Sequence, residues 1–215
     1  MNFKCHPFNE DKESMKCSAY IRSVSDDQHE ILRNIATLYT DGAFDLDPTY
    51  GSGSFYKNGV PEPSIKSDIM PKRPGVRKCD CRKLDFLTGC VNSIVFDPPF
   101  VHAHGKASLI GIRFGSFKSQ RELGEFYLSS MTKFYRILRR RGVLVFKCQD
   151  IVESGKQVWN HCKIWDMANR IGFIAEDFFV LVAKHRLKGH NHGRQVHARK
   201  FHSYFWVFRK IEIKG

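Results

Sequence analysis

The sequence predicts an α/β protein with a mostly parallel sheet that ends in an antiparallel pair of strands. Helical and strand-like periodicities alternate along most of the chain, and short apolar, β-branched runs end at Pro or Gly. A hydrophobic fraction of 42%, which includes 18 Phe, is enough for a sizeable core. The 215 residues are therefore expected to form a single domain over residues 23–215, preceded by a polar N-terminal arm over residues 1–22.

The first half of the chain predicts one helix and a few short strands. Ser25 and Gln28 form a capping-box pattern ahead of apolar residues at helical spacing, which predicts a helix ending near Gly42. A short strand over residues 43–47 runs into a turn rich in Pro and Gly. Residues 56–78 are typical of connecting structure, with residues 65–70 as a candidate strand.

The second half predicts the centre of the sheet. Residues 91–96 are apolar and β-branched, as in a buried strand, and two prolines end the run. Apolar residues stepping from Leu123 to Leu138 predict a helix, for which residues 139–142 supply cations and a glycine at the C-terminus. The remaining predicted elements are a strand over residues 143–146, a helix around residues 158–168, and strands over residues 178–183 and 204–208.

Charge and cysteine content narrow the function classes. With 35 Lys and Arg against 22 Asp and Glu, the net charge of +13 favours a polyanionic partner, nucleic acid before an anionic membrane surface. No apolar run approaches the roughly 18 residues of a membrane span, and the start lacks a secretory pattern, so an intracellular, cytoplasmic or nucleoid-associated protein is expected. Seven scattered cysteines predict reduced thiols and no metal site.

Two motifs follow directly after predicted strands. The first is Asp-Pro-Thr-Tyr-Gly-Ser-Gly over residues 47–53, and the second is Asp-Pro-Pro-Phe over residues 97–100. Either motif alone is compatible with an ordinary turn. Ligands of open α/β sheets bind beyond the carboxyl ends of the strands, so we expect both motifs to face one crevice.

In this order and on this α/β background, the two motifs resemble those of the amino-directed S-adenosylmethionine-dependent DNA methyltransferases. The family's cofactor motif has the form Asp-Pro-x-x-Gly-Ser-Gly, and its catalytic motif is Asp-Pro-Pro followed by an aromatic residue. The resemblance covers residues 23–210 and implies a Rossmann-like class I methyltransferase fold with S-adenosyl-L-methionine as cofactor. The motif order resembles the family's gamma arrangement, although no separate target-recognition domain follows.

The resemblance implies a role for each matching residue. Asp68 corresponds to the acid at the ribose hydroxyls and Asp80 to the acid at the adenine amino group, although ordinary surface aspartates are the alternative for both. Carboxylates suit a cofactor that carries a positive sulfonium and no phosphate. The implied catalytic residues are Asp97, Pro98, Pro99 and Phe100. The implied cofactor-binding residues are Asp47, Pro48, Gly51, Gly53, Asp68 and Asp80.

The catalytic motif suits transfer to an exocyclic amino group, whose lone pair is delocalised into the base. The Asp97 carboxylate and the Pro98 carbonyl can accept the two N–H groups and so direct the lone pair toward the methyl group. Phe100 is expected to stack on a flipped-out base. Within the family, an initial Asp favours adenine N6 and an initial Ser favours cytosine N4.

A basic stretch over residues 184–200 separates the last two predicted strands. It is interpreted as a phosphate-binding loop, with a solvated loop as the alternative and a zinc site at its histidines less favoured. The predicted nucleic-acid-binding residues are Lys184, Arg186, Lys188, Arg194, Arg199 and Lys200. Residues 101–121 are interpreted as a lid over the target base.

These observations together predict methyl transfer from S-adenosyl-L-methionine to adenine N6 in DNA. An RNA base N-methyltransferase is the alternative among enzymes, since related RNA enzymes use similar motifs. A catalytically silent nucleic-acid-binding or scaffold subunit of the same fold is the alternative outside them. Because no recognition domain is visible, target specificity is expected from loops, a homodimer or a separate specificity subunit.

Overall fold

The computed structural model describes residues 20–101, 117–184 and 196–211. In these residues, eight strands form one sheet in the order β1-β9-β10-β6-β5-β2-β3-β4. The strands are β1 (Val24–Ser25), β2 (Leu46–Asp47), β3 (Ile65–Asp68), β4 (Arg77–Lys78), β5 (Val91–Phe96), β6 (Leu138–Cys148), β9 (Phe173–Val182) and β10 (His202–Lys210). A separate hairpin consists of β7 (Ile151–Glu153) and β8 (Lys156–Val158).

The strand pairing confirms the predicted sheet. Neighbouring strands are parallel except for β10, which is antiparallel to both β6 and β9. From the adjacent pair β2 and β5, the chain proceeds outward in opposite directions, through β3 to β4 on one side and to β6 on the other. This pair is the topological switch point, where open α/β sheets bind ligands.

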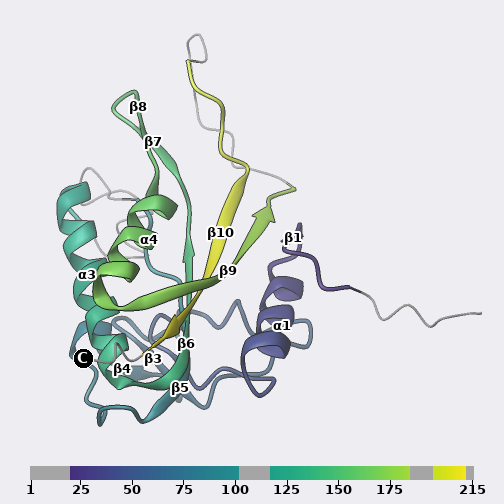
Figure 1. Ribbon diagram of the computed structural model, residues 1–215, viewed down its shortest axis with the longest axis vertical. Coiled ribbons are helices and arrows are strands. Elements are labelled where there is room, and N and C mark those ends of the chain that lie inside the picture. The colour runs from purple at the N-terminus through teal and green to yellow at the C-terminus, as the bar shows by residue number, and fades with distance from the viewer. Residues whose placement is uncertain (1–19, 102–116, 185–195, 212–215) are drawn as a thin grey trace, which may run out of the picture.

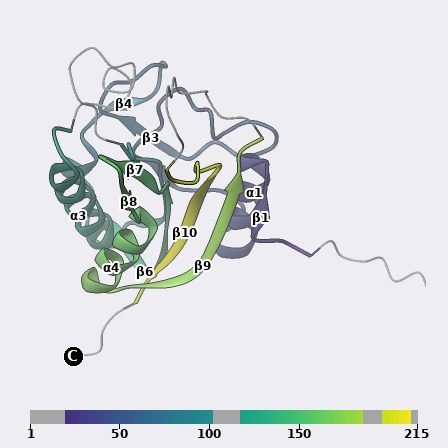
Figure 2. The same cartoon turned by 90° about the horizontal axis from the view of Figure 1, so that it is seen from above.

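Helices cover both faces of the sheet (Figures 1 and 2). Helices α3 (Gln120–Ile137) and α4 (Asn160–Ile171) pack on one face, and α1 (Gln28–Tyr39) packs on the other. The core under α3 and α4 includes Phe96, Phe134 and Phe146, whereas the core on the α1 side is formed by residues such as Ile31 and Phe205. Within the described ranges, no helix has the length and apolar character to cross a bilayer.

The structure corrects the predicted start of α1. Asp27, rather than Ser25, is the N-cap, and its carboxylate accepts the backbone N–H of His29. Ser25 pairs in β1 and donates its hydroxyl to Glu30. The helix also ends at Tyr39, before Gly42. Several Ser and Asp residues in a row offer alternative caps, and pairing with β9 decides between them.

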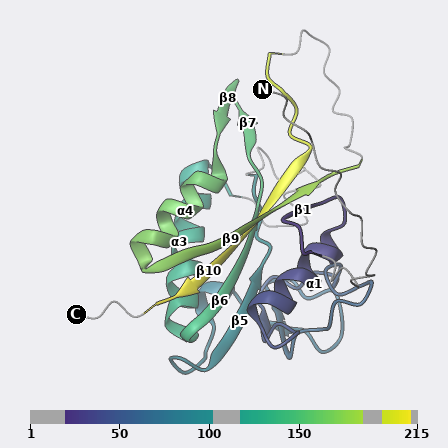
Figure 3. The ribbon, with the colours of Figure 1, turned by 45° about the vertical axis from the view of Figure 1, so that its right-hand side comes forward.

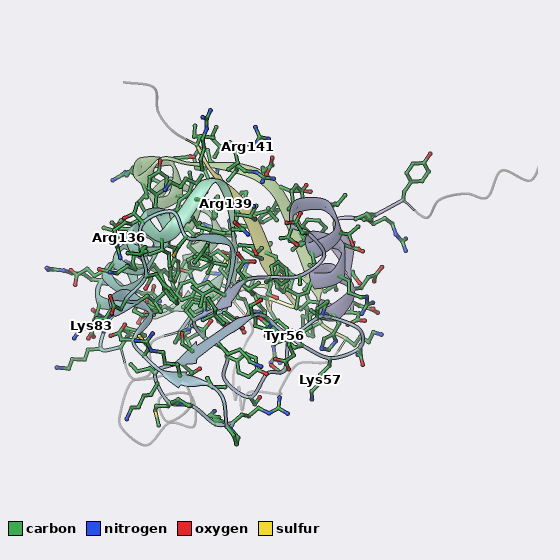
Figure 4. The ribbon with its side chains drawn as sticks, turned by 90° about the horizontal axis from the view of Figure 1, so that it is seen from below. Tyr56, Lys57, Lys83, Arg136, Arg139 and Arg141 are labelled. Atoms are coloured by element: carbon green, nitrogen blue, oxygen red, sulfur yellow. The ribbon has the colours of Figure 1, made fainter. Side chains whose placement is uncertain are left out.

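The structure also corrects the end of the long helix. Helix α3 stops at Ile137, and Arg139, Arg140 and Arg141 belong to β6, where Arg141 has a φ of +61°. Figure 4 shows Arg136, Arg139 and Arg141 from below, at the end of the molecule away from the β7–β8 hairpin. The cations therefore lie at the amino end of a strand instead of capping a helix.

The β7–β8 hairpin and the true start of α4 were not predicted. Val158 lies in β8, and α4 begins at Asn160. Trp165, which marked the expected apolar face of this helix, is 46% exposed. The apolar spacing from Val158 to Ala168 combined residues of a strand and a helix, and so suggested a helix that begins too early.

Candidate functional site

A cavity of about 960 Å³ lies at the carboxyl ends of β2, β3, β4 and β5. Side chains of α3, among them Glu122 and Phe126, form its opposite wall. Its volume is near the upper end of the roughly 300–1,000 Å³ of small-molecule sites. The switch point of the sheet therefore opens into a space large enough for a cofactor together with part of a second substrate.

Most of the residues that the sequence predicted for the site lie at this cavity. The predicted residues that line it are Asp47, Pro48, Gly51, Asp68, Asp80, Asp97 and Pro99. Gly53, Pro98 and Phe100 are not among the lining residues. The two motifs thus meet at one cavity, as expected from strands that end at the same edge of the sheet.

Asp47 is a buried carboxylate at the end of β2. Its Oδ1 accepts the backbone N–H of Thr49 at 2.8 Å, and its Oδ2 accepts the hydroxyl of Tyr56 at 2.7 Å. With only 2% of the residue exposed, burial raises the pKa of Asp47 to about 7, in spite of these donors. Charge at this position is therefore costly without a cationic partner.

The glycines of the first motif have different roles. Gly51 has a φ of +57° and donates its N–H to Asp68 Oδ2 at 2.8 Å, which fixes the acid at the end of β3 against the loop. Gly53 has a φ of +72°, and a Cβ there would lie 2.5 Å from the Tyr50 hydroxyl. Gly53 therefore allows the loop to close over Tyr50, while Gly51 faces the cavity.

Asp80 lies at the end of the cavity beyond β4, in an ion pair. Arg82 Nη2 lies 2.6 Å from Asp80 Oδ2, and this pairing lowers the pKa of Asp80. The Arg82 guanidinium also lies 5.5 Å from the centre of the Phe126 ring. A ligand amino group would share the Asp80 carboxylate with Arg82, which the sequence did not indicate.

Asp97 contacts residues of two neighbouring strand ends. Its backbone N–H donates to Thr49 Oγ1 at 2.9 Å, and its carboxylate Oδ2 lies 3.6 Å from Lys147 Nζ near the end of β6. Burial raises the pKa of Asp97, and the nearby ammonium of Lys147 opposes this shift. The Lys147 ammonium also lies 4.7 Å from the centre of the Phe55 ring.

The backbone of the second motif is held from the α3 and α4 side. The buried Tyr127 of α3 donates its hydroxyl to the carbonyl oxygen of Pro99. Asn160, the first residue of α4, has its Nδ2 2.8 Å from the carbonyl of Gln149 and 3.4 Å from that of Phe100. The motif is thus fixed by side chains as well as by its prolines.

The predicted nucleic-acid-binding residues fall partly within the described structure. Lys184 is exposed and lies 3.0 Å from Asp26 Oδ2, and Arg199 is exposed. Lys200 Nζ lies 4.7 Å from the centre of the Trp159 ring. Arg186, Lys188 and Arg194, like residues 102–116 of the predicted lid, lie outside the described residues.

Sequence reasoning missed three side chains of this site: Tyr56, Tyr127 and Lys147. Tyr127 was assigned to an apolar helical face, which is correct but does not reveal the contact of its hydroxyl. Tyr56 follows closely after the first motif, and its aromatic ring stacks on Tyr50 with centroids 5.4 Å apart. Lys147 directly follows a predicted strand, so its place at a strand end was the one available signal.

Comparison with known proteins yields similarity in structure but not in sequence. No family model matches the sequence, and no curated protein matches it. The 1,6-didemethyltoxoflavin-N1-methyltransferase of Burkholderia thailandensis has a TM-score of 0.51 at 13% identity, over 87% of this chain and 80% of its own. TrmN of Thermus thermophilus has a TM-score of 0.50 at 16% identity, over 85% and 49%.

A cytosine-N4-specific PvuII DNA methyltransferase has a TM-score of 0.47 at 17% identity, over 61% of this chain and 47% of its own. The chain thus spans about half the length of several structures that it matches, including 51% of a second Thermus thermophilus protein. At these identities the comparisons establish the fold alone. The strand order of the main sheet, in which β10 is the one antiparallel strand among the described residues, is that of the Rossmann-like fold of class I methyltransferases.

Proposed function

We propose that this protein is an S-adenosyl-L-methionine-dependent methyltransferase that methylates the exocyclic amino group of a base, adenine N6 in DNA. One observation carries the proposal: Asp97 and Pro99 line the same cavity as Asp47, Gly51 and Asp68. A methyl donor and an amino acceptor need adjacent sites, because transfer requires the reacting atoms to be close.

The residues at the cavity suit S-adenosyl-L-methionine. When bound, this cofactor supplies an activated methyl group and carries positive charge without phosphate. Asp47 offers a buried carboxylate of raised pKa, for which a cation is a favourable partner. Asp68 offers lone pairs for hydroxyl groups beyond the two backbone N–H groups that it accepts, and Ile69 beside it is 54% exposed and can cover an aromatic ring.

For the acceptor, the chain supplies hydrogen-bond acceptors in a fixed place. The Asp97 carboxylate, which lines the cavity, accepts one N–H group of the amine. The second N–H is assigned to the Pro98 carbonyl, although Pro98 is not among the lining residues. Tyr127 and Thr49 hold the backbone of the motif. Lys147 favours the ionised form of Asp97, which is the form that accepts hydrogen bonds without competing as a donor. Lys147 is therefore a positioning residue in this proposal.

Adenine is the preferred base because the second motif begins with Asp, and the chain's net charge of +13 favours a nucleic acid substrate. DNA is preferred to RNA because the two motifs resemble those of the DNA methyltransferases. To test the proposal, the purified protein is incubated with tritium-labelled S-adenosyl-L-methionine and either unmethylated DNA or RNA, and nucleosides are identified by mass after digestion. N6-methyladenine from DNA is the expected product. The same product from RNA would support the alternative substrate class instead.

Matched aspartate variants assign the reaction to the site. Asp97→Asn should abolish transfer while cofactor binding persists, whereas Asp85→Asn, a change at an exposed aspartate, should leave the rate unchanged. Transfer by Asp97→Asn at the wild-type rate would contradict the proposed mechanism. Absence of cofactor binding by the wild-type protein would contradict the methyltransferase assignment and favour the silent-subunit alternative.

A further inference from the structure

The β7–β8 hairpin projects beyond the carboxyl end of β6, away from the main sheet (Figures 1 and 3). Its turn residues Ser154 and Gly155 have φ values of +46° and +74°, as in the two-residue turns that suit a twisted hairpin. The pairs Ile151–Val158 and Glu153–Lys156 fix its register. The hairpin is therefore a regular protrusion, and the strand order of the main sheet does not require it.

Residues 196–201 pack against this hairpin. His197 Nε2 lies 2.7 Å from the carbonyl oxygen of Gly155 at the turn, and Lys200 Nζ lies 4.7 Å from the centre of the Trp159 ring. Gln149, just before the hairpin, donates its Nε2 to the carbonyl oxygen of His202 at 3.0 Å. Two segments far apart in the sequence thus form one surface, which we call the hairpin platform (residues 151–159 and 196–201).

The platform is joined to the catalytic motif through the start of α4. Asp150, with 1% of the residue exposed, accepts the backbone N–H of His161 at 3.2 Å and the His161 ring at 2.8 Å. Asn160 reaches the carbonyl oxygens of Gln149 and Phe100. Trp159 therefore directly precedes a residue whose side chain contacts the second motif.

The chemistry of the platform fits a nucleic acid strand. Trp159 is 48% exposed, and Lys200 covers its ring, which leaves indole surface open to a ligand. Lys156 and Arg199 are exposed, and Phe201 is 43% exposed. Aromatic rings flanked by cations bind polynucleotides by base stacking and phosphate contacts. The one acid in the hairpin, Glu153, leaves the platform with a net positive charge.

We propose that the hairpin platform binds the nucleotides next to the target base, with Trp159 stacking on one of them. It would then supply contacts to the target strand. The stacking and phosphate contacts do not depend on catalysis, while the existence of a target base rests on the proposed function. The cavity at Asp97 would hold the target base, and the platform would hold the adjoining strand.

The test measures binding, without cofactor or turnover, by fluorescence anisotropy of labelled single-stranded DNA. Trp159→Ala should weaken binding about 5- to 150-fold, the range expected for loss of one stacked base. Trp159→Phe should recover much of the loss. Trp165→Ala is the matched control, because Trp165 is 46% exposed on α4 and lies outside the platform. Circular dichroism verifies that each variant folds.

A second variant tests the charged part of the platform. Lys156→Gln combined with Arg199→Gln should reduce the dependence of binding on salt concentration, because phosphate contacts are removed. The platform proposal would be overturned if wild type and Trp159→Ala bound DNA with equal affinity. It would also be overturned if Trp159→Ala and Trp165→Ala lost the same amount of DNA affinity. The same binding measurement with RNA and with duplex DNA of the same sequence identifies the preferred form of nucleic acid.

Failure of the platform and failure of the proposed function give different results. If the wild-type protein binds DNA through Trp159 but transfers no methyl group, the proposed function fails and the platform stands. If the protein methylates DNA and Trp159→Ala neither binds more weakly nor raises KM, the platform fails and the proposed function stands.

Discussion

Thr49 and Asp97 are joined by a hydrogen bond in which the Asp97 backbone N–H donates to Thr49 Oγ1 at 2.9 Å. The same hydroxyl lies 3.3 Å from Asp47 Oδ1, to which it donates. One side chain therefore connects the loop after β2 with the loop after β5, across the switch point of the sheet. Because the two loops are coupled in this way, a change at the proposed cofactor motif should also affect the proposed catalytic motif.

Thr49→Val tests this coupling, because valine keeps the shape and removes the hydroxyl. Leaving the Asp97 N–H without its partner should cost about 1–3 kcal/mol of unfolding free energy. The methyl-transfer rate should fall roughly tenfold or more, since Asp97 loses a positioning contact. Thr132→Val is the control, because Thr132 is exposed and donates its hydroxyl to the Leu128 carbonyl within the same helix. Similar rates for both variants would contradict the coupling.

Lys147→Met tests the electrostatic role of Lys147. Removing an ammonium that lies 3.6 Å from the Asp97 carboxylate should raise the pKa of Asp97 further. Because transfer needs ionised Asp97, the acidic limb of the rate profile should shift to higher pH, with cofactor affinity little changed. Lys66→Met is the matched control, because Lys66 also has an acidic partner, Glu62, and an aromatic partner, Tyr50, but is not paired with Asp97. An unshifted profile in Lys147→Met would refute this role.

Asp47→Asn tests the cost of the buried carboxylate in the protein without cofactor. Burial raises the pKa of Asp47 in the folded state to about 7, from an ordinary value of 3.8. The folded state therefore binds the proton more tightly, and wild-type stability falls as pH rises from about 4 to 7. The variant lacks this loss, so its stability relative to wild type should increase over that range and level off above pH 7. Urea denaturation at several pH values measures this difference, and a constant difference would contradict it.

Gly53→Ala tests the close approach between the first motif and Tyr50. Alanine would combine a left-handed φ with a Cβ 2.5 Å from the Tyr50 hydroxyl. Gly75→Ala has a similar φ of +78° and no atom within 4 Å of its Cβ, so it carries the backbone strain alone. Thermal or urea unfolding should show Gly53→Ala less stable than Gly75→Ala by about 1–3 kcal/mol, the usual cost of overpacking. Equal stabilities would mean that Tyr50 moves aside freely.

Local sequence patterns predicted the elements that depend on local rules. The buried strand β5 appears at residues 91–96, as its apolar β-branched run indicated, and the antiparallel pairing of the last two strands is confirmed. Element ends were less predictable. The cap of α1 depends on the pairing of β1 with β9, and the end of α3 depends on the pairing of β6 with β5. The sequence offers several plausible caps and stops, and local patterns alone do not select among them.

The hairpin shows a different limit. Its Ser154-Gly155 turn is a recognisable hairpin signal, but strands of three residues are too short for periodicity to separate them from the start of a helix. Likewise, the resemblance implied a ligand role for Asp80, and the nearby Arg82 was not recognised as its ion-pair partner.

The sequence by itself determined the α/β class, the order of the two motifs and their location after parallel strands, because periodicity and turn chemistry are local properties. Only the tertiary structure decided that Lys147 faces Asp97, that Thr49 connects the two loops, and that residues 196–201 lie against the β7–β8 hairpin. These contacts join residues that are distant in the chain. The first two exist because the strand order places β2, β5 and β6 side by side, and the third because β10 lies next to β6. No local pattern encodes that order.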